Sequence, residues 1–114
     1  MATPIKLCLK ASVLTLNTIV NHAESYDSKQ PETLAVIDNV KVAVELIVKA
    51  MVELDAVNYL EAKYLLELTQ IKLGRTLLEH DLLVPRGVVT AINDTTTECV
   101  ETIELILNLL NEVL

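Results

Sequence analysis

Arg75 is a positively charged residue at a position where helical spacing predicts an apolar one. At helical spacing it continues a line of apolar residues, namely Leu60, Tyr64, Leu68, Ile71 and Leu78. A guanidinium on an apolar face requires a partner, because an unpaired buried charge is strongly unfavourable. Two interpretations stay open. Arg75 either forms an ion pair, with Glu79 or with an acid across a subunit interface, or it binds an anion together with Tyr64.

The segment from Arg75 to His80 also has the form Arg-x4-His. It resembles the motif of the HEPN superfamily, all-helical proteins of which many are metal-independent ribonucleases that act as dimers. The resemblance implies that Arg75 stabilises a phosphate and that His80 does acid–base work. An HEPN-like dimeric ribonuclease or toxin-type protein is therefore one alternative function. The second alternative is a binder of a small anionic ligand or nucleotide, in an intersubunit pocket formed by Arg75, Tyr64 and His80.

The remaining residues with reactive side chains show no spacing typical of a site. Cys8 and Cys99 are far apart in the sequence, and both fall at apolar helical positions, where thiols are usually inert. We expect both to be reduced thiols. His22 and His80 are the only histidines, and neither lies at zinc-ligand spacing from a cysteine. The sequence therefore predicts no metal site and no cofactor.

Charge and composition exclude several classes of function. With 9 basic and 16 acidic residues the net charge is −7, which argues against a nucleic-acid partner and suits a basic protein partner. Glu98, Glu101 and Glu104 follow one another along a helix but no Glu-x-x-His accompanies them, so they predict a solvated acidic face. Apolar stretches shorter than a membrane span, and the absence of a signal-peptide pattern, favour a cytoplasmic protein with a single domain over residues 1–114.

Hydrophobic periodicity predicts four helices, the first over residues 4–24 and the second over residues 31–54. In the first, helical spacing relates Ile5, Leu9, Ser12, Leu16, Ile19 and Ala23. The β-branched residues in 13–20 also allow a strand, but the chain offers it no partner strand. The second helix carries one narrow charged stripe, made of Asp38, Lys41, Glu45, Lys49 and Glu53. Most of its remaining circumference is apolar and therefore favours burial.

The third predicted helix, over residues 58–83, carries two apolar stripes, which is typical of a helix with two neighbours. One is the line that Arg75 continues, and the other contains Tyr59, Leu66, Leu73 and Leu77. The fourth helix spans residues 86–114 or starts later at Thr95, which can form a capping box with Glu98. A seam with alternating spacing of three and four runs along it through Val89, Ile92, Thr96, Cys99, Ile103, Ile106, Leu110 and Val113.

Four helices joined by short connections predict an all-α protein, an antiparallel up-down-up-down four-helix bundle that is oligomeric. The basic start of the first helix should lie beside the acidic end of the fourth, with Lys6 and Lys10 towards Glu104 and Glu112. Surplus aliphatic surface favours a non-enzymatic interaction module that self-associates as a homodimer. The interface should consist of residues 31–54 together with parts of the third and fourth helices, so a glutamate at Val44 or Ile47 should weaken it.

Overall fold

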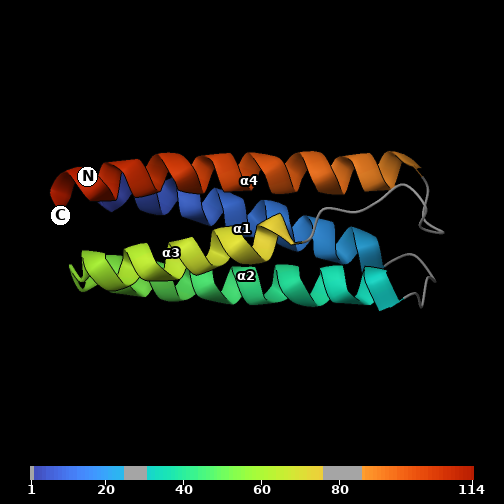
Figure 1. The fold of residues 1–114 in the computed structure, drawn as a ribbon, viewed down its shortest axis with the longest axis horizontal. Coiled ribbons are helices and arrows are strands. Elements are labelled where there is room, and N and C mark those ends of the chain that lie inside the picture. The colour runs from blue at the N-terminus through green and yellow to red at the C-terminus, as the bar shows by residue number, and fades with distance from the viewer. Residues whose placement is uncertain (1, 25–30, 76–85) are drawn as a thin grey trace.

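The computed structural model describes residues 2–24, 31–75 and 86–114, and these residues are helical apart from short turns and ends. The four helices are α1 (Ala2–Glu24), α2 (Pro31–Asp55), α3 (Tyr59–Gly74) and α4 (Arg86–Val113). They lie along the long axis of a molecule that measures 45 × 19 × 19 Å (Figure 1). The described residues contain no strand, so the prediction of four helices is confirmed and the strand interpretation of residues 13–20 is wrong.

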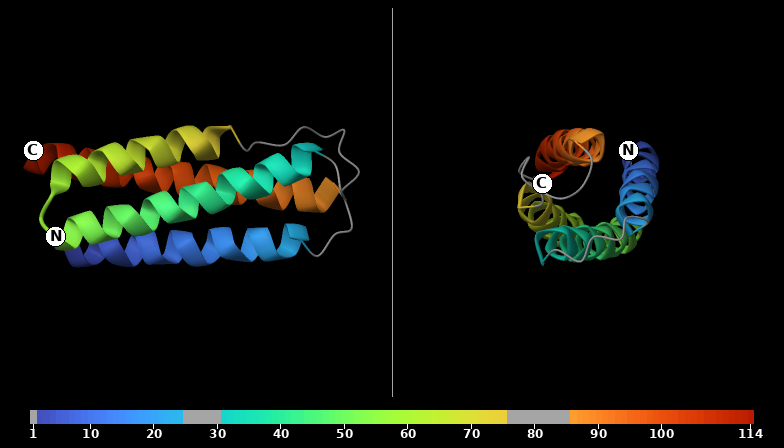
Figure 2. Two further views of the ribbon diagram at one scale, coloured as in Figure 1. Left: turned by 90° about the horizontal axis from the view of Figure 1, so that it is seen from below. Right: turned by 90° about the vertical axis from the view of Figure 1, so that its right-hand side faces the viewer.

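The helices are arranged as a ring around a shared core. Each of α1 and α3 contacts both α2 and α4, whereas the described parts of the diagonal pairs, α1 with α3 and α2 with α4, do not meet (Figure 2). The start of α1 and the end of α4 lie at the same end of the molecule (Figure 1). Each helix therefore turns one face to the core and leaves its opposite face outside.

The inward faces of α1 and α4 are those that the periodicity predicts. In α1 all six expected positions are buried, from Ile5 to Ala23. In α4 the buried residues include Ile92, Thr96, Cys99, Ile103, Ile106 and Leu110. Val113, the last position of the predicted seam, is exposed. Burial of these aliphatic side chains is the main stabilising contribution to a fold of this kind.

α4 begins at Arg86 and is continuous, so the alternative start at Thr95 is wrong. Ile92 lies upstream of Thr95 and is buried on the same face as Thr96 and Cys99. Burial of that apolar side chain stabilises the earlier turns of the helix, and the Thr95 backbone is therefore part of the helix interior.

The third helix is shorter than predicted. α3 ends at Gly74, and Arg75 follows as its C-cap, with the Arg75 backbone N–H donating to the Lys72 carbonyl oxygen at 3.2 Å. Glycine destabilises a helix interior by about 1 kcal/mol relative to alanine, which favours a helix end at this position. The rest of the predicted helix, with Leu77, Leu78, Glu79 and His80, lies outside the described residues.

The connection from α2 to α3 is a Schellman motif. The Asn58 backbone N–H donates to the Glu53 carbonyl at 2.8 Å, and the Val57 N–H donates to the Leu54 carbonyl at 3.1 Å. Val57 has φ 59°, in the left-handed region that this motif requires and that β-branched residues rarely adopt. The Asn58 side chain also donates to the Glu53 carboxylate at 3.0 Å, which fixes the turn on its α2 side.

Two ion pairs join α1 to α2. The Lys6 ammonium lies 2.6 Å from the Asp55 carboxylate, and the Lys41 ammonium lies 2.9 Å from the Glu24 carboxylate. The hydrogen bond to Glu24 and its negative charge raise the pKa of Lys41. The contact of α1 with α4 is confirmed, but the prediction that Lys6 faces Glu104 is wrong. Lys6 lies on the α2 side of α1, and Glu104 instead accepts a hydrogen bond from Gln70 of α3.

Candidate functional site

α3 carries a line of apolar residues that is largely exposed in the described structure. Leu60, Tyr64 and Ile71 are 68%, 55% and 51% exposed, and Leu68 beside them is half-buried. We call these four residues the α3 ridge. They lie in one line because Leu60 and Ile71 are separated by about three helical turns. Of the two predicted stripes of α3, the structure buries the one with Leu66 and Leu73 and leaves this one outside.

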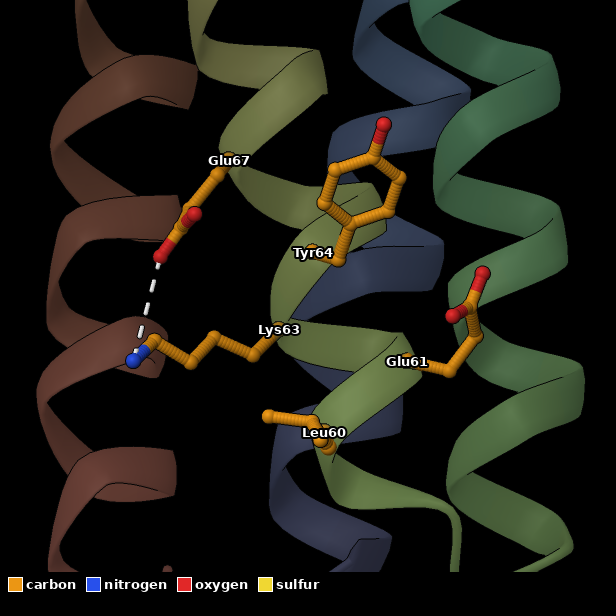
Figure 3. A pocket seen from close by; sticks show the side chains of 5 residues that line it. All are labelled: Leu60, Glu61, Lys63, Tyr64 and Glu67. Atoms are coloured by element: carbon orange, nitrogen blue, oxygen red, sulfur yellow. Dashed lines mark ion pairs between the residues drawn. The ribbon is translucent and has the colours of Figure 1, made fainter.

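A hollow of about 480 Å³ lies along the first half of the α3 ridge. It is lined by Leu60, Glu61, Lys63, Tyr64 and Glu67 (Figure 3). Glu61 extends towards α2, whereas Lys63 extends towards α4 and approaches Glu67 to 3.9 Å (Figure 3). Because all five residues belong to one helix, this hollow is a depression of the surface rather than an enclosed pocket.

The predicted binding residues are not brought together in the described structure. Tyr64 lines the hollow, but Arg75 does not. The two residues are about 16 Å apart along the helix direction. Arg75 is exposed at the end of α3, so its charge is in water and requires no buried partner, contrary to the interpretation from its spacing. His80 and Glu79 lie outside the described residues, and with them the Arg-x4-His motif and the proposed Arg75–Glu79 pair.

The outer face of α2 differs from the surface that its composition predicts. Asp38, Lys41, Glu45 and Lys49 are exposed, as expected for the charged stripe. Ile47 is fully buried and Val44 is half-buried against the core. The prediction that these two residues face a second subunit is therefore wrong, because α2 packs against both α1 and α3 and uses that surface inside the bundle.

Exposed valines of α2, such as Val48, alternate with the charges of that stripe. They form no continuous apolar line comparable to the α3 ridge.

The acidic residues of α4 lie in solvent. Glu98, Glu101 and Glu104 are all exposed, as predicted for a solvated acidic face. No group of three His, Cys, Asp or Glu side chains in the described residues is placed to hold a metal ion.

Both cysteines line one hollow between α1 and α4, a feature that sequence separation does not suggest. Cys8 is exposed and Cys99 is buried, and the hollow that they share measures about 250 Å³. Burial raises the pKa of the Cys99 thiol, and a hydrogen bond with Ser12 opposes part of that shift. One feature of the sequence could have indicated this hollow: the small residues Ala11 and Thr15 lie one helical turn apart on the same side of α1.

None of the described helices combines the length and the apolar character that a membrane span requires. No family model, curated protein or solved structure matches the chain.

Proposed function

We propose that this protein is a non-enzymatic helical interaction module that self-associates as a symmetric homodimer through the α3 ridge. Each copy is an antiparallel up-down-up-down four-helix bundle. The observation that supports the proposal is the exposed line of Leu60, Tyr64 and Ile71. Single exposed apolar residues are common on protein surfaces, but a continuous apolar line on one helix is typical of an interaction surface.

The charges beside the α3 ridge are complementary to those of a second, antiparallel copy of the same helix. Glu61 and Lys72 lie on the same side of the ridge, about three turns apart. A two-fold axis near the middle of the ridge places Leu60 against Ile71 of the second copy. The same axis places Glu61 near Lys72 of the second copy, and the symmetry repeats this pair. A second copy therefore fits both the apolar line and the charges beside it.

The size of the α3 ridge indicates a weak dimer. A helix of 16 residues is about 24 Å long and presents a face about 10 Å wide, which is less than a standard protein interface buries. Neighbouring side chains at the margins of α2 and α4 have to add to the contact. We therefore expect dissociation in the micromolar range, so that dimer and monomer both appear at accessible concentrations.

The test is the molar mass in solution as a function of concentration. Sedimentation equilibrium and light scattering should show a reversible dimer for the wild-type protein. Ile71→Glu places a charge in the apolar contact and should raise the dissociation constant at least about 100-fold. Val48→Glu is the matched control, because it adds the same charge at an exposed position of α2 and should leave the dimer intact.

Charge exchange tests the antiparallel arrangement. Glu61→Lys should weaken the dimer because it places two like charges together, and adding Lys72→Glu should restore the original affinity. A monomeric wild-type protein at all concentrations contradicts self-association. A dimer that Val48→Glu disrupts and Ile71→Glu does not contradicts the α3 ridge as its interface.

A further inference from the structure

A second surface feature, independent of the α3 ridge, follows the seam between α1 and α4. Two hollows lie along this seam, the one of about 250 Å³ that contains both cysteines and another of about 360 Å³. Thr15 lines both, so the two hollows are adjacent, and we call them together the α1–α4 groove. From Cys8 to His22 the groove is about 21 Å long, or about four helical turns.

The groove is shaped by small side chains above an apolar floor. Ile19 and Ile92 form the buried floor of the larger hollow. The walls consist mostly of small residues on both helices, namely Ala11, Ser12, Thr15, Thr18, Ala91, Thr95 and Thr102. Small residues repeated at helical spacing leave the holes into which larger side chains of a third helix can pack.

The hydroxyl groups in the wall of the groove are partly satisfied by their own helix. The Thr15 hydroxyl donates to the Ala11 carbonyl at 2.8 Å, and the Thr18 hydroxyl donates to the Leu14 carbonyl at 2.9 Å. These two threonines therefore do not depend on a polar ligand for their hydrogen bonds. An apolar occupant consequently suits the groove better than a small polar molecule.

Large exposed apolar side chains lie at the edge of the groove. Leu14 lines the larger hollow and is 69% exposed. Leu105 is 66% exposed. It lies seven residues after Glu98, which lines the smaller hollow, and therefore on the same face of α4. The groove thus has holes in its floor and apolar contacts at its edge, the combination that accepts the apolar face of an amphipathic helix.

The charges around the groove indicate the chemistry of that helix. Glu98 lines the groove on its α4 side, and Asp94 and Glu101 are exposed on the same helix. The α1 side has no acidic residue before Glu24. A helix whose basic residues face the acidic α4 side of the groove would complement this rim. We propose that the α1–α4 groove binds a basic amphipathic helix of a different protein.

The test uses a defined peptide. The probe is a fluorescent peptide of about 15 residues in which leucines repeat at heptad spacing and lysines occupy the other positions. Its anisotropy is measured against the protein at about 150 mM salt, where long-range charge attraction is screened. A control peptide has glutamate in place of lysine. The measurements use both the wild-type protein and Ile71→Glu, so that they do not depend on dimer formation at the α3 ridge.

Leu14→Glu and Val48→Glu separate groove binding from general attraction. Both substitutions add one negative charge at an exposed position, but only Leu14 lines the groove. We expect the lysine peptide to bind in the micromolar range, Leu14→Glu to weaken binding at least tenfold, and Val48→Glu to leave it unchanged. Helical circular dichroism of each variant should match that of the wild type, because neither side chain is in the core.

Three results overturn the proposal. Equal binding by both variants means that the peptide recognises only the net negative charge. Binding of the glutamate peptide with similar affinity means that charge plays no part in the recognition. Absence of peptide binding, together with a dimer that Leu14→Glu disrupts, assigns the groove to a second copy of this chain.

Discussion

Replacing Val57 by glycine tests whether the turn between α2 and α3 stores backbone strain. Val57 has φ 59° and occupies the left-handed position of the Schellman motif that ends α2. For a residue with a Cβ atom this conformation costs about 1–2 kcal/mol, and a β-branched side chain lies at the upper end of that range. Glycine adopts the same conformation without that cost.

Two effects reduce the stabilisation expected from Val57→Gly. Glycine adds flexibility to the unfolded chain, which costs about 0.7 kcal/mol. The valine side chain is 67% exposed, so its removal loses only about 0.5 kcal/mol of burial. Subtracting both from a strain of about 2 kcal/mol leaves a net stabilisation of about 1 kcal/mol. For a chain of this length that corresponds to a rise in Tm of about 3–5 °C.

The measurement is urea unfolding followed by circular dichroism, at one fixed protein concentration because a dimer would add to the apparent stability. Val57→Ala is the control. Alanine keeps the Cβ atom and most of the strain but loses the same burial, so its free energy of unfolding should equal or fall below that of the wild type. A Val57→Gly protein that is no more stable than the wild type refutes the strain at this turn.

Two further predictions concern buried groups. Thr96→Val should raise the free energy of unfolding by about 1 kcal/mol, because the buried Thr96 hydroxyl has no hydrogen-bond partner among the described residues. In Thr69→Val, where the buried hydroxyl donates to the Leu65 carbonyl, we expect no such gain, and equal gains in urea unfolding would contradict this reasoning. Iodoacetamide near pH 8 should modify Cys8 much faster than Cys99, because Cys8 is exposed and Cys99 is buried. Since burial raises the pKa of Cys99, its rate of modification should continue to increase at pH values above the ordinary thiol pKa of 9.0. Mass spectrometry of Cys8→Ser and Cys99→Ser measures each thiol separately, and similar rates would contradict the burial of Cys99.

The sequence alone determined the presence of four helices and the inward faces of α1 and α4. Periodicity is a local property, so the positions from Ile5 to Ala23 and from Ile92 to Leu110 follow from residue spacing and are buried as predicted. The ends of the helices were predicted unevenly. The connection between α2 and α3 agrees with the prediction to within one residue, although the left-handed conformation of Val57 contradicts the preference of a β-branched residue, whereas α3 ends at Gly74, before the predicted end at residue 83.

The tertiary structure decided which outward surfaces remain without a partner. Spacing shows that α3 has two apolar stripes, but it does not show which one faces the core, and the same limit placed Ile47 wrongly on an outer surface. Spacing also does not state which neighbour a charged residue faces, so Lys6 was assigned to α4 although it pairs with Asp55 of α2. The α1–α4 groove combines residues far apart in the chain. Its existence therefore depends on the packing of whole helices, which no local pattern specifies.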